Sequence, residues 1–165
     1  SAASDVYKRQ GSLIAAAGSY GTILSGAPEA TIQTLARYGE LVGVAFQLAD
    51  DVIDVTGVDT VSGKTSGTDL REGVPTLPTI LLQQEAEKGD PEAQHILGLI
   101  QADLSSDDAL AQAVEALAAH PVTQRAWNIA YQWADDAIAV LEPLEDSTAK
   151  QALKSFAHAV VHREA

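Results

Sequence analysis

The feature that constrains this chain most is a series of apolar residues spaced three and four apart between Pro28 and Val55. This spacing puts the apolar side chains on one side of an α-helix and predicts a core-facing helix over 28–55. The residues that carry it are Ile32, Leu35, Ala36, Leu41, Val42, Ala45, Leu48, Ala49 and Val52. Further helices are expected at 11–25, 76–88, 91–101, 106–119, 122–142 and 147–162, with N-cap signals at Asp90-Pro91, Ser105-Ser106 and Ser147. The pattern therefore predicts an all-α chain.

Composition supports this fold class and excludes several functions. Aromatic residues make up 5% of the 165 residues, whereas alanine and leucine, which lose little side-chain freedom in a helix, are frequent. The formal charge of −13 argues against a nucleic-acid partner, because phosphate backbones bind clustered cationic surfaces. With no cysteine and no long apolar run, we expect a cytoplasmic protein that has no disulfide and is not transmembrane.

The first ten residues, SAASDVYKRQ, differ from the rest of the chain. The alanine-rich helical pattern starts abruptly at Gly11. We interpret 1–10 as a non-native leader and 11–165 as the helical domain.

A glycine-rich stretch over 56–75 is predicted to be a loop. It contains Gly57, Gly63, Gly67, Gly73 and Pro75. A loop of this length within a helical domain is uncommon and is usually either functional or disordered.

Carboxylates gather at the end of the long predicted helix. Asp50 and Asp54 are four residues apart, and Gln47 precedes Asp50 and Asp51 by three and four, so these side chains share one broad helix face. Like charges one turn apart repel, and Mg²⁺ would offset this repulsion because it binds carboxylate oxygens and bridges them to substrate phosphates. Lys64, in the following Gly-Lys pair, could neutralise charge on a bound diphosphate. A solvated acidic helix face is the alternative interpretation.

Two segments resemble one enzyme family. FQLADDVIDVTG and GKTSGTDLREGVPTLPTILL are similar to the second aspartate-rich region of the trans-isoprenyl (polyprenyl) diphosphate synthases. A looser similarity extends over 9–163. The resemblance implies the C-terminal half of an isoprenoid synthase-like helical bundle whose N-terminal helices are missing.

The resemblance also implies roles for individual residues. Asp50, Asp51 and Asp54 would hold Mg²⁺ against the diphosphate of an allylic substrate, and Lys64 would contact that diphosphate. Asp50, Asp51 and Lys64 are thus the expected catalytic residues.

The remaining implied roles concern substrate binding. Phe46 and Gln47 would line the site, Gln47 at the reacting end, and Asp69 would support the metal ligands or the loop. The implied reaction is head-to-tail condensation of an allylic prenyl diphosphate with isopentenyl diphosphate, in an enzyme that is a homodimer at full length.

Other interpretations remain open. The family has a further aspartate-rich motif, but none lies before residue 46, so we expect the chain alone to be inactive. A noncatalytic subunit-like homologue, a class I terpene cyclase and an acidic helical interaction domain are the alternatives. Asp135 and Asp136 lack a third carboxylate, and His158 and His162 lack the glutamate of HExxH, so we assign neither pair to a metal.

Overall fold

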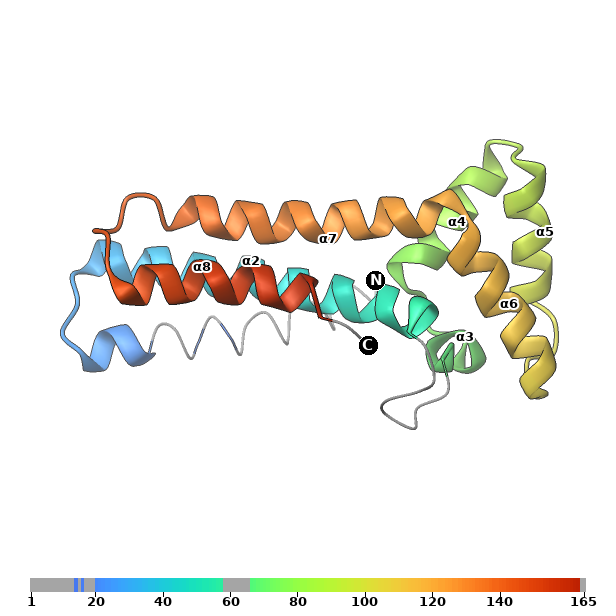
Figure 1. Ribbon diagram of the computed structural model, residues 1–165, viewed down its shortest axis with the longest axis horizontal. Helices are drawn as coiled ribbons and strands as arrows, with labels where there is room; N and C mark the ends of the chain where they lie inside the picture. The colour runs from blue at the N-terminus through green and yellow to red at the C-terminus, as the bar shows by residue number, and fades with distance from the viewer. Residues whose placement is uncertain (1–13, 15, 17–19, 58–65, 164–165) are drawn as a thin grey trace. The chain divides into compact units, whose positions relative to one another are not determined.

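The computed structural model describes residues 14, 16, 20–57 and 66–163, and the regular secondary structure in that part of the chain is helical (Figure 1). Residues 20–24 are helical, and the helices that follow are α2 (Glu29–Thr56), α3 (Thr68–Glu72), α4 (Leu77–Glu87), α5 (Pro91–Ile100), α6 (Asp107–Ala119), α7 (Pro121–Val140) and α8 (Thr148–Val161). The predicted all-α fold is confirmed. The leader predicted at 1–10 lies outside the described residues.

The chain divides into two compact units. The first combines the residues up to Ala49 with Ile129–Arg163, and the second is Asp50–Asn128. Helix α2 begins in the first unit and ends in the second.

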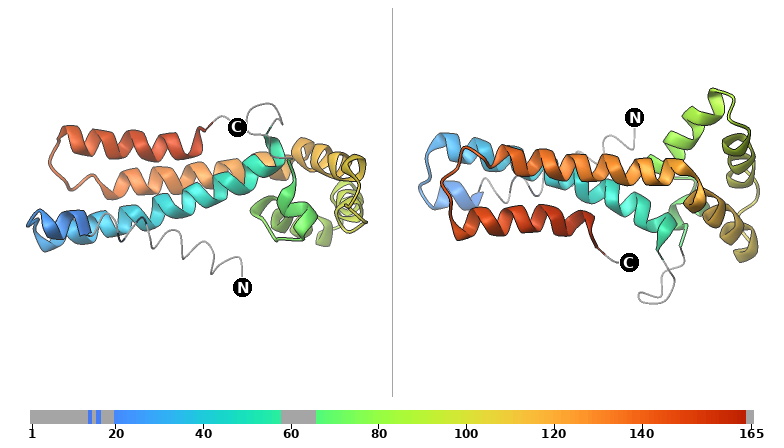
Figure 2. Two further views of the ribbon diagram at one scale, coloured as in Figure 1. Left: turned by 90° about the horizontal axis from the view of Figure 1, so that it is seen from below. Right: turned by 45° about the horizontal axis from the view of Figure 1, so that its top comes forward.

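In the first unit, α8 lies alongside α2 and the second half of α7, as the views agree (Figures 1 and 2). The predicted apolar periodicity becomes its core: Leu41, Val42, Ala45, Leu48 and Ala49 are buried on α2. Helix α7 contributes the small residues Ala130, Ala134 and Ala137 at steps of three and four, and all three are buried. Small side chains on this stripe allow neighbouring helices to approach closely.

Two buried polar side chains stabilise this unit through hydrogen bonds. The hydroxyl of Tyr38 on α2 donates to the carbonyl oxygen of Leu153 on α8 at 2.7 Å. Lys150 is 5% exposed, and its Nζ donates to the carbonyl oxygens of Leu144 and Glu142 at the turn between α7 and α8. Nζ also contacts Asp146 Oδ1 at 3.1 Å, so the buried ammonium group has three oxygen partners.

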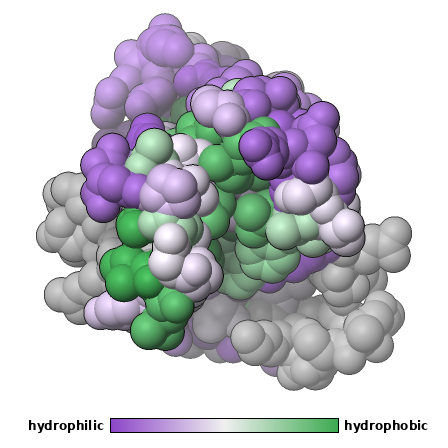
Figure 3. All heavy atoms as spheres, turned by 90° about the vertical axis from the view of Figure 1, so that its left-hand side faces the viewer, coloured by the Kyte–Doolittle hydropathy of each residue, from purple (hydrophilic) through white to green (hydrophobic). Residues whose placement is uncertain are grey.

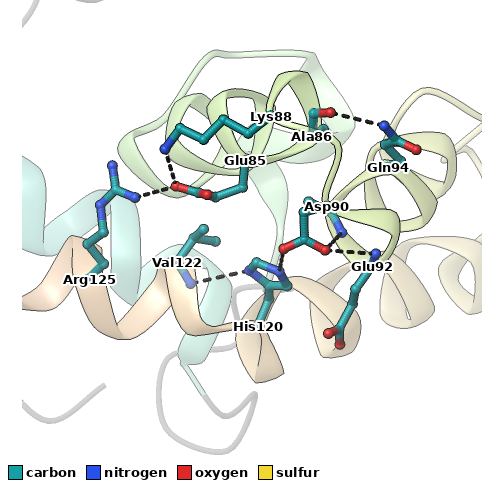
Figure 4. Close-up of polar contacts among 10 residues, drawn as sticks. Glu85, Ala86, Lys88, Asp90, Glu92, Gln94, His120, Val122 and Arg125 are labelled. Atoms are coloured by element: carbon teal, nitrogen blue, oxygen red, sulfur yellow. Dashed lines mark hydrogen bonds and ion pairs between the residues drawn. The ribbon is translucent and has the colours of Figure 1, made fainter.

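In the second unit, α4 packs against α5, α5 against α6, and α3 against α6. Figure 4 shows polar contacts among α4, α5 and the junction between α6 and α7. Asp90 Oδ1 accepts from the amides of Glu92 and Ala93 and caps α5, while Asp90 Oδ2 lies 3.6 Å from Nε2 of the buried His120. Glu85 Oε1 accepts from Lys88 and Arg125. The expected caps are confirmed at Asp90 and Ser147, and of the pair Ser105-Ser106 it is Ser106 that caps its helix.

The prediction that 56–75 is entirely loop was wrong for its second half. Thr68–Glu72 forms the short helix α3, flanked by Gly67 and Gly73 in the left-handed conformation at φ 81° and 67°. Leu70 in this helix is 4% exposed. Five residues are too few to display a periodicity in the sequence, and α3 owes its position to contacts with α6.

Some large apolar side chains stay on the surface. Figure 3 shows apolar residues exposed among polar ones on one face of the molecule. In the first unit Tyr20, Ile23, Leu24 and Phe156 are between 48% and 87% exposed. None of the described helices combines the length and the apolar character that crossing a membrane requires.

The Tyr38 hydroxyl gives the first unit a pH-dependent contribution to stability. Burial raises the pKa of Tyr38 to about 12, so the folded protein holds this proton more tightly than the unfolded chain does. The contribution is complete below about pH 10, the ordinary pKa of tyrosine, and is lost as the pH rises toward 12.

Replacing Tyr38 by phenylalanine should therefore lower the free energy of unfolding by about 1 kcal/mol at neutral pH, since one buried hydrogen bond is removed. Between pH 10 and 12 the variant should lose less stability than the wild type. Urea unfolding at both ends of this range measures the difference. Tyr20→Phe, at a residue that is 67% exposed, is the control. Parallel losses in all three proteins would show that the Tyr38 proton does not contribute.

Candidate functional site

The predicted carboxylates lie on the last two turns of α2. Asp50 is exposed, while Asp51 and Asp54 are half-buried. Gln47 is only 8% exposed, so the polar face expected from the sequence is buried at its Gln47 end and open at Asp50. Val52 and Val55 are buried and hold this end of the helix in the second unit.

Two of these carboxylates bind the first residues of other helices. Asp51 Oδ2 accepts a hydrogen bond from the amide of Leu77, the first residue of α4, at 2.8 Å. Asp54 Oδ2 accepts from the amide of Asp69, the second residue of α3, at 3.1 Å. Amides at a helix start lack partners within their own helix and attract negative charge. The protein itself therefore offsets part of the carboxylate repulsion that a cation was expected to relieve.

Gly67 and Arg71 fix the position of α3. The amide of Gly67 donates to the carbonyl oxygen of Asp54 at 2.7 Å. A Cβ at Gly67 would lie 2.4 Å from Val114 Cγ2 on α6, so only glycine fits this contact. Arg71 Nε donates to the Leu104 carbonyl oxygen, and its guanidinium pairs with Asp107 at 2.6 Å. Helix α3 is thus held between the end of α2 and α6.

Asp69 lies in α3, close to the carboxylates of α2. Burial raises the pKa of its carboxyl, and the negative charges of Asp54, Glu72 and Asp50 raise this pKa further. The structure thus brings Asp69 into the electrostatic surroundings of Asp50 and Asp54, and its role in supporting the metal ligands stays a prediction.

The residues before the carboxylates have a partner that sequence reasoning missed. The guanidinium carbon of Arg163 lies 4.0 Å from the centre of the Phe46 ring, in a cation–π arrangement within the first unit. No local pattern could indicate this contact, because the two residues are 117 positions apart.

The carboxylates at the end of α2 are oxygen donors of the kind that Mg²⁺ binds. Among the described residues, no group of three or more histidine, aspartate or glutamate side chains gathers closely enough to hold a metal alone. Mg²⁺, however, is usually held by one or two carboxylates together with water and substrate phosphates. The exposed Asp50 and the half-buried Asp51 and Asp54 supply oxygen donors of this kind, so the residues fit an ion shared with a ligand. Lys64 lies outside the described residues.

Comparison with known proteins extends these findings. The model of the family described as polyprenyl synthetase matches residues 4–117. Nonaprenyl diphosphate synthase of Mycobacterium tuberculosis is 37% identical over 158 residues, which are 96% of this chain and 46% of that protein. Octaprenyl diphosphate synthase of Escherichia coli is 33% identical over 96% of this chain and 48% of its own length.

Solved structures of polyprenyl and geranylgeranyl pyrophosphate synthases are also similar to this chain. Geranylgeranyl pyrophosphate synthase from Corynebacterium glutamicum, crystallised with calcium and isoprenyl diphosphate, superposes with a TM-score of 0.82 at 35% identity. The superposition covers 94% of this chain and 47% of that one. Polyprenyl synthase from Caulobacter crescentus, crystallised with the same two ligands, gives a TM-score of 0.80 at 33% identity, over 93% of this chain and 46% of that one.

The helical fold and the DDxxD segment of α2 are therefore those of an isoprenoid synthase-like protein. This chain belongs to the polyprenyl synthetase family. It spans about half the length of the relatives that it matches, and the resemblance to the C-terminal half of the family is confirmed.

The close approach of Gly67 to α6 generates a prediction about stability. Gly67→Ala should lower the free energy of unfolding by about 2 kcal/mol or more, because both the left-handed backbone and the contact with Val114 oppose a Cβ. Chemical denaturation followed by circular dichroism measures this change.

Two other glycines separate the cost of the left-handed backbone from the cost of the contact with Val114. Gly73 has φ 67° but open space around it, so Gly73→Ala should cost about 1 kcal/mol from the backbone alone. Gly98 lies inside α5 with open space and no positive φ, so Gly98→Ala should stabilise by about 0.5–1 kcal/mol. Equal costs at Gly67 and Gly73 would show that α6 does not restrict residue 67.

Proposed function

We propose that this chain forms one carboxylate-bearing wall of a polyprenyl diphosphate synthase. The reaction would be transfer of a prenyl group from an allylic diphosphate to isopentenyl diphosphate. The observation that carries the proposal is that a member of this family places DDxxD where α2 meets the first residues of α3 and α4. Because the chain spans about half of its relatives, the activity is proposed for the complete protein.

Asp50, Asp51 and Asp54 are proposed to hold Mg²⁺. The bound ion would neutralise diphosphate and make it a better leaving group. The Corynebacterium glutamicum relative, crystallised with calcium and isoprenyl diphosphate, supports a pairing of divalent cation and diphosphate in this family. One oxygen of Asp51 and one of Asp54 accept hydrogen bonds from backbone amides of α4 and α3, so a bound ion would share these carboxylates with the protein.

The chain's other residues would bind and orient the substrate. Lys64 would place an ammonium charge against the diphosphate. Phe46 and Gln47 would line the site next to the carboxylates, and Asp69 would support the metal ligands or the loop. A dry, helix-walled cavity in the complete protein would keep water from the allylic cation that forms when diphosphate leaves. The complete protein would act as a homodimer, as the family resemblance implies.

The first test is binding of inorganic pyrophosphate by calorimetry, with and without Mg²⁺. The wild-type chain should bind only when Mg²⁺ is present. Asp50→Asn combined with Asp51→Asn should weaken binding by more than about tenfold, because charged oxygen donors are lost while the side-chain shape is kept.

The acidic pair on α7 provides a matched control. Asp135→Asn with Asp136→Asn removes the same charge from two exposed residues and should leave pyrophosphate binding unchanged. Equal weakening by the two double variants, or binding that does not need Mg²⁺, would contradict the proposed site. Thermal melting of each variant separates lost binding from lost fold, since Asp51 also bonds to α4.

The second test concerns the reaction itself. The 165-residue chain, incubated with geranyl diphosphate, radiolabelled isopentenyl diphosphate and Mg²⁺, should give no elongated prenyl product above background. The reason is that it contains one aspartate-rich motif where the family uses two. Extraction of the products and thin-layer chromatography provide the measurement. A labelled product from the chain alone, abolished by Asp50→Asn, would refute this expectation.

A further inference from the structure

Arg163 makes an unusual set of contacts just beyond the end of α8. Its Nε donates to the carbonyl oxygen of Val160 at 3.0 Å, which fixes the side chain to its own helix. Its Nη2 reaches the carbonyl oxygen of Phe46 at 3.4 Å, and its guanidinium carbon lies 4.0 Å from the centre of the Phe46 ring. One side chain thus contacts both the backbone and the ring of Phe46.

These contacts restrict the Phe46 side chain one helical turn before Asp50. Phe46 lies four residues before Asp50 in α2, so its carbonyl oxygen is also the helical acceptor for the amide of Asp50. The ring is half-buried, and a guanidinium plane over one aromatic face limits the rotamers that the ring can adopt. The next residue, Gln47, is itself buried at 8% exposure.

We propose that Arg163 is a positioning residue that fixes the Phe46 ring as a wall for the hydrocarbon part of a prenyl diphosphate. This inference rests on the proposed function for the identity of the ligand. Arg163 is not assigned to the diphosphate, because its Nε and Nη2 are directed at carbonyl oxygens and its plane covers the ring. A residue that binds diphosphate directly would present this donor fork to the phosphate oxygens.

The composition of the chain permits a direct spectroscopic test. There are only two phenylalanines, Phe46 and the 48% exposed Phe156, so ring-labelled phenylalanine gives two sets of NMR signals. Phe156→Tyr assigns them. Arg163→Gln should shift the Phe46 ring signals and leave those of Phe156 in place. Arg163→Lys, which keeps the charge but loses the planar stack, should give an intermediate shift.

A binding measurement with two probes separates positioning from direct contact with phosphate. In the presence of Mg²⁺, Arg163→Gln should weaken geranyl diphosphate binding by about two- to fivefold, the range expected from one cation–π contact. Binding of inorganic pyrophosphate, which has no hydrocarbon, should not change. Arg37→Gln is the matched control, since Arg37 is an exposed residue of the same unit paired with Glu40 on α2.

Each outcome decides the proposal. Selective weakening for geranyl diphosphate, with partial recovery in Arg163→Lys, supports it. Equal weakening for both probes overturns it, because Arg163 would then act on the diphosphate. Unchanged Phe46 signals in Arg163→Gln overturn it as well. If the wild-type chain binds neither probe, the proposed function fails, and the NMR shift alone decides whether Arg163 positions Phe46.

Discussion

The interaction on which the second unit depends is the pairing of α2 carboxylates with the amides that begin α3 and α4. Asp51 bonds to Leu77, and Asp54 bonds to Asp69. Charged acceptors make stronger hydrogen bonds than neutral ones, and helix starts present amides that need an outside partner. One short segment of α2 therefore sets where two later helices begin.

This pairing links the fold to the proposed chemistry. The carboxylates that would hold a cation also hold the helices around it, so any ion at Asp51 or Asp54 must share these groups with backbone amides. Asp69 stands at the junction: its amide is bound by Asp54, while its own carboxyl has a raised pKa from burial and from neighbouring negative charges. A cation placed here would lower the repulsion among these carboxylates. The carboxylates are already held in position by their hydrogen bonds to backbone amides.

Sequence reasoning succeeds where the determining contacts are local. The three- and four-residue spacing predicts α2 to within a residue at each end, and Asp90 and Ser147 indicate their caps because the capped amides follow directly. It fails for α3 and for the Arg163–Phe46 contact, because both depend on distant residues. The roles assigned to the carboxylates and to Lys64 come from family resemblance and stay predictions.

The two ends of the segment between Gly57 and Ser66 are held together, and this affects the free energy of closing the connection. Ser66 Oγ donates to the Gly57 carbonyl oxygen at 2.5 Å, and the neighbouring Gly67 amide binds Asp54. The closure is thus made outside the segment. Doubling the length of such a connection costs only about 0.6 kcal/mol of chain entropy. The free energy of closing this connection therefore depends little on its length, and the bonds at its two ends keep their places next to the carboxylates of α2.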